Sequence, residues 1–363
     1  MKYFILFLSL GCLVFLLWGC GKDKSTSPEP AQHDYQIVFG TLWDGNLQPP
    51  GFHLPVLSSM NDSIYDSIPV KTEVHAMCFS GDGSTLFLTH LPEVYDEAMT
   101  WVIDWKTKDT IAAYSGRCGR RLSLSTDNNY LLVSGYHLTL FSSPELNFIY
   151  EAQVKNLGGL IIPNRNLACY CPIISDSLCF IDFNNSPVST YALHLKTDNG
   201  LPLEIESVGS SLSGDSLILL TNYNHNANYL VIASTDSLDV IDIISIPYHN
   251  FWYSYPIINP SNNNQIFFFS PGNPFDTGPG TQKKGALYSL SLSEEHIVSI
   301  FGENENYYFP GHIALSPDNS LLYVTAGILL KYQLPLLELS IPHEKGDISG
   351  GSLAINPLDL NRN

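Results

Sequence analysis

Short stretches of alternating hydrophobic and polar residues, each followed by a tight polar turn and a second apolar run, recur along the chain. The clearest copy is Gly311–Thr325, in which Ile313 and Leu315 point to one face. The turn Ser316–Asn319 follows, and then the apolar run Leu321–Val324. Period-two alternation is typical of a half-buried strand, and Ser-Pro-Asp-Asn is typical of a reverse turn. The unit therefore predicts a strand, a turn and a second strand.

Five further copies of this unit precede the clearest one. The turn centres of the six copies are Asp82, Asp127, Asn164, Asp215, Asn262 and Asp318. Successive centres are 45, 37, 51, 47 and 56 residues apart. A period of about 40–50 residues is the length of one four-stranded blade of a β-propeller. The third copy, Leu160–Tyr170, matches the pattern least well, and six or eight blades would follow if it were misread.

Two more apolar segments of strand length follow each copy. These segments are 100–104, 110–114, 137–141, 147–151, 178–183, 188–193, 229–233, 238–243, 286–290, 296–300, 328–332 and 336–341. At the chain ends, Gly351–Pro357 has the pattern of a first strand, and Tyr35–Gly40, Phe52–Leu57 and Ile64–Pro69 supply three more. The prediction is an all-β, seven-bladed β-propeller of four-stranded blades. Its last blade is closed by one C-terminal and three N-terminal strands, which removes exposed sheet edges.

From Tyr35 to Pro357 the repeats resemble those of YVTN-type and WD40-like propellers, including the quinoprotein amine dehydrogenase beta chain. The resemblance rests on the first strand, the S-x-D-x or S-P-D-N turn and the following L-L-Y-V-T. It implies the fold, and it implies little about function, because propellers serve as binders, scaffolds and enzymes. In such a propeller the fourth-to-first and second-to-third connections share the face where ligands usually bind.

The N-terminus has the order of a secretory signal: Lys2, an apolar core, and then Leu17-Trp18-Gly19-Cys20. The apolar core is too short to favour a permanent membrane-spanning helix. The last four residues resemble the lipobox of bacterial lipoproteins, although Trp18 is larger than usual at its position. The resemblance implies that residues 1–19 are a signal peptide and that Cys20 is the lipid attachment site. A plain secreted protein is the alternative.

The segment after the signal is small, polar and contains proline, with no apolar face to bury. We expect residues 20–32 to be a lipidated cysteine and a flexible tether, and residues 33–363 to form the propeller domain. Gly21 rather than Asp follows the cysteine, which favours the outer membrane. The expected protein is thus exported and anchored to the bacterial cell envelope through its N-terminal lipid, as a monomer.

The charge of the chain is strongly negative, with a formal net charge of −18. Such a surface repels phosphate backbones, which argues against a nucleic-acid partner. Solubility explains the charge, and steering of a cationic ligand is the alternative.

Candidate binding residues lie on connections at the expected ligand face. Arg117, Arg120 and Arg121 precede the second repeat, and arginine favours carboxylate or phosphate ligands. Salt bridges to local acids are the alternative. Aromatic platforms suited to sugars or a protein partner come from two inter-blade connections, and packing between blades is their alternative. These aromatic residues are Trp252, Tyr253, Tyr255, Tyr307 and Tyr308.

Histidines precede two first strands, His75 and His312. A histidine at such a place is a candidate ligand-binding or catalytic group, or a structural hydrogen-bonding one. No G-x-S-x-G, H-E-x-x-H, P-loop or calcium-loop motif is present in the sequence, so we expect no catalytic residue, no metal and no cofactor.

Five cysteines fall in the propeller domain: Cys78, Cys118, Cys169, Cys171 and Cys179. The exported compartment permits disulfides, and Cys169 or Cys171 could meet Cys179 across one hairpin. The odd count leaves at least one free thiol. Cys78 takes the place of Ser123 and Ala314 in the repeat, which predicts a small buried residue.

These patterns together favour a non-catalytic module that binds or scaffolds a protein or glycan at the cell envelope. The alternative is a propeller enzyme of the lactonase or quinoprotein-dehydrogenase-like type, acting at the channel mouth. That alternative needs His75, His312, Arg117 and Arg121 to converge.

Overall fold

Antiparallel strands make up nearly all the regular structure of this computed structural model. It describes residues 33–44, 51–70, 73–90, 99–116, 119–135, 137–153, 156–173, 175–184, 188–196, 200, 202–211, 213–223, 227–246, 256–259, 265–270, 286–294, 296–301, 312–325, 329–334, 337–343 and 349–359. The predicted signal peptide, Cys20 and the tether lie outside these residues. From Asp34 onward the chain forms one unit.

Within these ranges the strands form seven antiparallel sheets of four strands each. Blade 1 contains β4 (Val74–Phe79), β5 (Thr85–His90), β6 (Met99–Asp104) and β7 (Thr110–Ser115). Blade 2 contains β8 (Arg121–Leu124), β9 (Tyr130–Ser134), β10 (Leu138–Ser142) and β11 (Phe148–Ala152). Blade 3 contains β12 (Asn156–Ile161), β13 (Leu167–Pro172), β14 (Ser177–Asp182) and β15 (Ser189–His194).

The remaining blades follow the same order. Blade 4 contains β16 (Glu204–Ser210), β17 (Ser216–Tyr223), β18 (Ala227–Ser234) and β19 (Val240–Ile246). Blade 5 contains β20 (Ile257–Ile258), β21 (Gln265–Ser270), β22 (Ala286–Ser291) and β23 (His296–Phe301). Blade 6 contains β24 (Ile313–Leu315), β25 (Leu321–Thr325), β26 (Leu329–Gln333) and β27 (Glu338–His343). The closing blade joins β28 (Ser349–Asp359) to β1 (Tyr35–Asp44), β2 (Gly51–Ser58) and β3 (Ile64–Val70).

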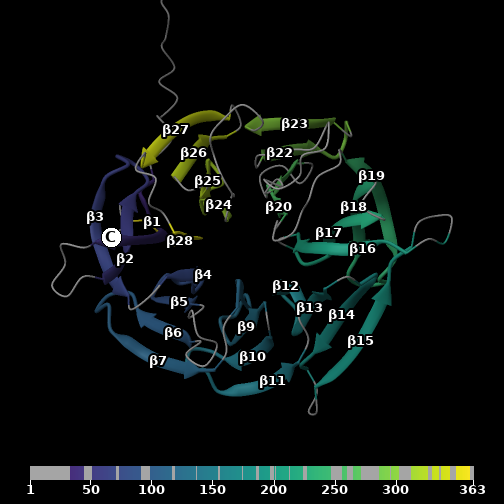
Figure 1. Cartoon of the computed structure of the whole chain (residues 1–363), viewed down its shortest axis with the longest axis horizontal. Coiled ribbons are helices and arrows are strands. Elements are labelled where there is room, and N and C mark those ends of the chain that lie inside the picture. The colour runs from purple at the N-terminus through teal and green to yellow at the C-terminus, as the bar shows by residue number, and fades with distance from the viewer. Residues whose placement is uncertain are drawn as a thin grey trace, which may run out of the picture. The chain divides into compact units, whose positions relative to one another are not determined.

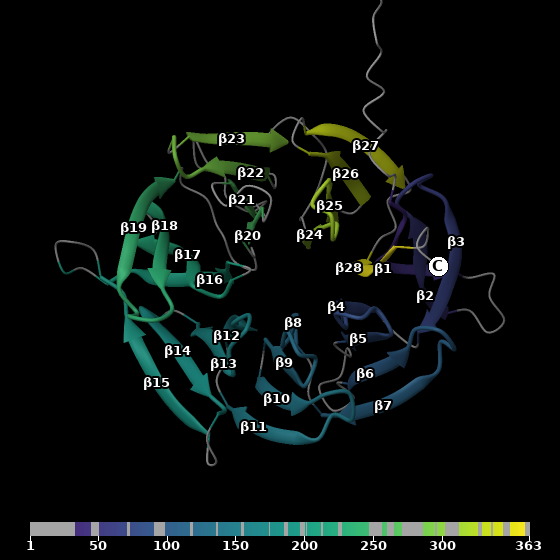
Figure 2. The ribbon, with the colours of Figure 1, turned by 180° about the vertical axis from the view of Figure 1, so that it is seen from behind.

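The blades are arranged in a ring, with the first strand of each blade innermost (Figures 1 and 2). Seven clusters of buried apolar side chains hold it together, and each cluster joins two neighbouring blades. The predicted fold is therefore confirmed, including the degenerate third repeat as blade 3. Alternation places successive side chains on opposite faces of each sheet, so every blade contributes to two of these interfaces.

The ring closes through pairing of the two ends of the propeller. β28 runs antiparallel to β1, with Val38 opposite Ala354 and Phe39 opposite Leu353. Phe39 is fully buried in the cluster that joins this blade to blade 6. Pairing of the first and last strands in one sheet protects both from pairing with another chain.

A buried polar network joins the closing blade to blade 1. The Gln36 Oε1 atom accepts hydrogen bonds from Trp105 Nε1 at 2.6 Å and from Asn356 Nδ2 at 3.0 Å. Asn356 Nδ2 also faces the carbonyl oxygen of Gly83 at 3.3 Å, and Asn356 Oδ1 accepts from the backbone N–H of Leu358 at 3.0 Å. The first strand, the last strand and the first turn of blade 1 thus share one network.

The repeated Ser-x-Asp turn is a side-chain hydrogen-bonding motif. In blade 6, Ser316 Oγ donates to Asp318 Oδ1 at 2.6 Å and accepts from the Leu321 N–H at 2.9 Å. The same pair of bonds occurs at Ser125 in blade 2 and at Ser80 in blade 1. The fourth turn residue, Asn319 in blade 6, has φ of +58°, a conformation that asparagine tolerates. The likeness between the repeats therefore reflects the bonding of this turn.

The cysteines of blade 3 do not pair across their hairpin, although the sequence allowed it. Cys169 and Cys171 are buried in the cluster that faces blade 4, whereas Cys179 packs on the opposite side, against the cluster shared with blade 2. Cys179 lies opposite Tyr170, not opposite either cysteine. Cys78, Cys169, Cys171 and Cys179 are all free thiols, and Cys118 lies outside the described residues. Cys78 is only partly buried between blades 1 and 2, whereas its place in the repeat predicted a buried residue.

Candidate ligand site at the propeller axis

Polar residues gather where the innermost strands begin, on the face formed by the fourth-to-first and second-to-third connections. His75 lies in β4, Arg120 and Arg121 lie at the start of β8, and His312 precedes β24. These strands surround the axis of the ring (Figure 2). His75 and Glu206 each lie at a shift in strand register near the beginning of their strand. Their backbones therefore do not take part in the regular hydrogen-bond pairing with the next strand.

Arg121 joins three blades. Its Nη1 atom donates to the carbonyl oxygen of Val208 in β16 at 2.6 Å, so the side chain extends from blade 2 past blade 3 to blade 4. Burial raises the pKa values of the thiols Cys169 and Cys171, and the positive charge of Arg121 lowers them by a smaller amount. This effect of Arg121 indicates that its guanidinium lies close to blade 3. Arg121 is therefore a fixed cation near the axis.

The two histidines are close to the arginines and to each other. Burial lowers the pKa of His75 to about 4, with a smaller contribution from Arg120 and His90. Burial likewise lowers the pKa of His312 to about 4, with contributions from Arg121 and His75. His312 also makes a hydrogen bond to the backbone of His75. Both imidazoles are neutral at pH 7, so the permanent positive charge of the cluster comes from the arginines.

Three further polar groups on the innermost strands are buried. Glu206 in β16 is 5% exposed and is the single acid among the buried side chains of the described residues. The hydroxyls of Ser207 in β16 and Ser352 in β28 are buried and have no hydrogen-bond partner within the described part of the chain. A buried hydroxyl without a partner costs about 1–3 kcal/mol, so such positions favour a bound water or a polar ligand group.

The structure brings some of the sequence-predicted residues together and leaves others undescribed. Arg120, Arg121 and His312 converge with His75 around the axis. Arg117 and the five aromatic residues lie outside the described residues, namely Trp252, Tyr253, Tyr255, Tyr307 and Tyr308. The binding role of all these residues stays a prediction.

Sequence reasoning missed Glu206, Ser207 and Ser352. Their position in the repeat could have identified two of them. Counted back from the first turn of each blade, Ser207 and Ser352 occupy the same place as Arg121 and His312. Alignment of the blades on their turns groups these side chains from the amino-acid sequence alone.

Among the described residues, no group of three or more His, Cys, Asp or Glu side chains is placed to bind a metal ion. Over the same ranges, no helix has the length and apolar character needed to cross a membrane.

The chain matches no protein-family model and no curated protein sequence. Solved structures do resemble it. A putative 6-phosphogluconolactonase from Bacteroides uniformis has a TM-score of 0.63 at 11% identity, covering 89% of this chain and 100% of that one. The periplasmic gluconolactonase of Pseudomonas aeruginosa has a TM-score of 0.60 at 12% identity, covering 89% and 99%.

Structures with other roles are equally similar. Hydrazine synthase from Kuenenia stuttgartiensis has a TM-score of 0.60 at 14% identity, covering 79% of this chain and 92% of that one. A Myceliophthora Swd1 β-propeller domain has a TM-score of 0.59 at 13% identity, covering 78% and 90%. At these identities the likeness shows the fold alone, so the chain is a seven-bladed β-propeller with WD40-like architecture.

Proposed function

We propose that the protein is a binding propeller that holds an anionic group of a glycan or protein partner at its axis. The observation that carries this proposal is the convergence of Arg120 and Arg121 with two neutral histidines around the innermost strands. Arginine presents several N–H donors in a planar array that matches a carboxylate or phosphate. The chain has a net charge of −18, so most of its surface is expected to be acidic. A cluster of arginines at one place therefore stands out and supports a role in binding an anion.

The buried polar groups support the same proposal. Ser207 and Ser352 offer hydroxyls without partners among the described residues. Such groups suit the hydroxyls that accompany the acidic group in a sugar acid. We assign ligand recognition to Arg120 and Arg121 together, and Arg121 is held in place by its hydrogen bond to the carbonyl of Val208.

Isothermal titration with D-galacturonate, succinate and inorganic phosphate tests the proposal. D-Galactose serves as the neutral counterpart of galacturonate, because it has a hydroxymethyl group in place of the carboxylate and is otherwise the same sugar. We expect at least one anion to bind, galactose to bind at least tenfold more weakly than galacturonate, and Arg120→Gln to weaken anion binding at least tenfold. That factor corresponds to about 1.4 kcal/mol, the lower range for a hydrogen bond to a charged group.

Lys106→Gln is the control, because Lys106 is an exposed cation at the third-to-fourth-strand turn of blade 1, on the face away from the site. This variant should bind like the wild type. Absence of binding by all three anions, or equal loss in Arg120→Gln and Lys106→Gln, would refute the proposal.

Hydrolysis of a sugar lactone is a second candidate, favoured by the closeness of His75 and His312 to the arginines and to each other. A neutral imidazole can accept a proton from an attacking water, and an arginine can stabilise the oxyanion that forms on the carbonyl. Proton release from D-glucono-δ-lactone should then exceed the uncatalysed rate and be lost in both His75→Gln and His312→Gln. A rate equal to that of buffer excludes this candidate.

We also propose that Cys20 carries the lipid that anchors the protein to the cell envelope, with the outer membrane favoured. Several acyl chains on one residue give stable anchoring, since each buried CH₂ contributes about 0.8 kcal/mol. Metabolic labelling with an alkynyl fatty acid should mark the wild type and not Cys20→Ala. A label retained by the variant would contradict lipidation at this residue.

A further inference from the structure

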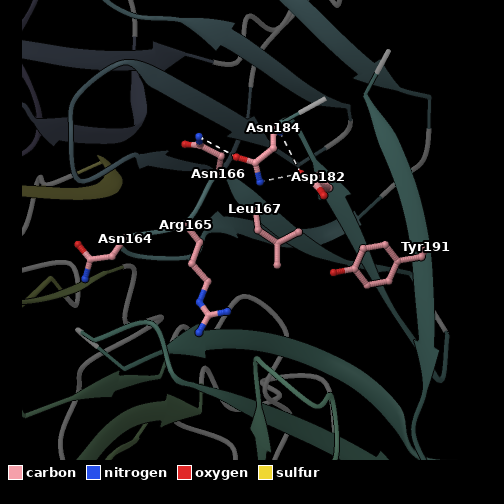
Figure 3. A pocket seen from close by; sticks show the side chains of 7 residues that line it. All are labelled: Asn164, Arg165, Asn166, Leu167, Asp182, Asn184 and Tyr191. Carbon is pink, nitrogen blue, oxygen red and sulfur yellow. Dashed lines mark hydrogen bonds between the residues drawn. The ribbon is translucent and has the colours of Figure 1, made fainter. Parts of the chain in front are cut away.

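A cavity of about 370 Å³ lies beside the first turn of blade 3 (Figure 3). Because this turn connects β12 to β13, the cavity is on the face opposite the one that carries Arg120, Arg121, His75 and His312. Its lining comes from the first-to-second-strand turn, the end of β14 and the outer strand β15. This volume is at the small end of the range of ligand pockets, about 300–1,000 Å³. All the lining residues are described, and none belongs to the axis site.

One wall of the cavity is a fixed row of amide and carboxylate groups. Asn166 Nδ2 donates to Asn184 Oδ1 at 3.0 Å, and Asn184 Nδ2 donates to Asp182 Oδ1 at 3.0 Å. The backbone N–H of Asn184 also donates to Asp182 Oδ1, at 2.9 Å. These bonds fix the direction of each amide, and they leave Asp182 Oδ2 and Asn166 Oδ1 as acceptors without a partner in the described chain.

The opposite wall is aromatic. Tyr191 is 42% exposed, and its ring stacks on the buried ring of Phe180 with centroids 4.9 Å apart and an interplanar angle of 10°. Figure 3 shows the hydroxyl of Tyr191 pointing into the space beside Leu167. A tyrosine braced in this way supplies a rigid apolar surface with one polar tip at little entropic cost.

Charge excludes an anionic ligand at this cavity. The guanidinium of Arg165 is held by two acids of blade 4, at 2.7 Å from Asp236 and 3.7 Å from Asp215. The two carboxylates therefore outweigh the single positive charge of Arg165, and Asp182 adds a further negative charge. A metal ion is also a poor match, because Asp182 is the single carboxylate among the lining residues.

The chemistry that remains is a neutral ligand rich in hydroxyl groups. A braced aromatic ring, planar amides and a carboxylate together supply an apolar face, hydrogen-bond donors and acceptors at short spacing. We propose that this cavity is a binding site for a neutral carbohydrate, separate from the anion site at the axis. Sugar rings match it because they have an apolar C–H face and an edge of hydroxyls that both donate and accept.

A glycan array carrying neutral and acidic oligosaccharides tests this site on the full propeller, with hits measured by saturation-transfer NMR. We expect a neutral oligosaccharide to bind and its ring protons to receive saturation. Tyr191→Ala should weaken binding at least tenfold, and Tyr191→Phe should weaken it less, because the stacked ring remains. Phe148→Ala is the control, since Phe148 is also an exposed aromatic, at 52%, and lies on the outer strand of blade 2.

Arg120→Gln, at the axis, should leave this binding unchanged, which separates the two sites. Circular dichroism melting verifies that each variant folds. The inference is overturned if no neutral glycan binds, if Tyr191→Ala binds like Phe148→Ala, or if the bound glycans are acidic and depend on Arg120.

Discussion

Asn356 offers the sharpest test of how the ring is closed. Its amide orientation follows from its neighbours: Trp105 Nε1 can only donate, so the atom of Gln36 that it contacts must be the oxygen. The atom of Asn356 facing that oxygen must then be Nδ2, and the fully buried side chain donates to Gln36 Oε1 and to the carbonyl of Gly83. Asn356→Asp replaces this donor by an oxygen at nearly constant volume.

The expected cost has two parts. Two hydrogen bonds are lost, at about 0.5–1.5 kcal/mol each, and a buried carboxylate then faces two carbonyl oxygens. Together we expect the free energy of unfolding to fall by about 3–5 kcal/mol at pH 7, as for other uncompensated buried charges. The new carboxyl group should have a pKa raised above the ordinary value of about 3.9 for aspartate. Its penalty is therefore complete at high pH and shrinks as pH falls toward that ordinary value.

Urea unfolding followed by tryptophan fluorescence measures this cost, because the buried indole of Trp105 belongs to the same network. Asn61→Asp is the matched control: Asn61 is exposed, and its Oδ1 only accepts hydrogen bonds from Ser63, a role a carboxylate keeps. A loss in Asn356→Asp equal to that of the control, or one that does not lessen at low pH, would refute the assigned network.

Three further predictions concern the turns, the histidines and the thiols. Ser316→Ala should lower the free energy of unfolding by about 1–2 kcal/mol, because it removes the hydrogen bonds to Asp318 and to the Leu321 N–H. Chemical denaturation measures this loss, with Ser293→Ala at an exposed position as the reference. His75 and His312 have folded pKa values of about 4, below the unfolded value of about 6.5, so the unfolded state binds more protons and stability is lost as pH falls from about 6.5 to about 4. His75→Gln should flatten that decline in melting temperature, and an unchanged slope would count against a buried neutral imidazole. Finally, Cys169 and Cys171 are buried thiols whose pKa values are raised by burial. They should resist iodoacetamide in the folded protein and react fully in urea, as mass spectrometry would show. Rapid labelling of the native protein would contradict their burial.

The fold was predictable because the same pattern of strand, turn and strand recurs in every blade. Each first turn needs a short polar cap, and Ser316 with Asp318 provides it in a form that also appears at Ser80 and Ser125. Even blade 3, where Ile162 replaces that serine, retains the backbone bond from the Ile162 N–H to the Leu167 carbonyl. The hydrophobic alternation then determines which residues enter the interfaces between blades.

The site was predictable only in part. The start of a first strand indicates proximity to the axis, which is why Arg120, Arg121 and His312 could be named from sequence. That Arg121 would reach blade 4 at Val208 depends on how the ring curves, and no local pattern contains this information. Cys169 and Cys179 illustrate the same limit, because the register of one hairpin decides whether two cysteines meet or lie on opposite faces. The cavity beside Tyr191 likewise depends on three strands and a turn packed together.

Anion binding at the axis of this acidic propeller is tested most directly by a crystal structure of the protein soaked with D-galacturonate. We expect density for the sugar acid among the innermost strands, with its carboxylate within hydrogen-bonding distance of the Arg120 guanidinium and its hydroxyls toward His75 or His312. Galacturonate bound elsewhere on the propeller, or an axis filled by side chains with no ligand density, would contradict anion binding there.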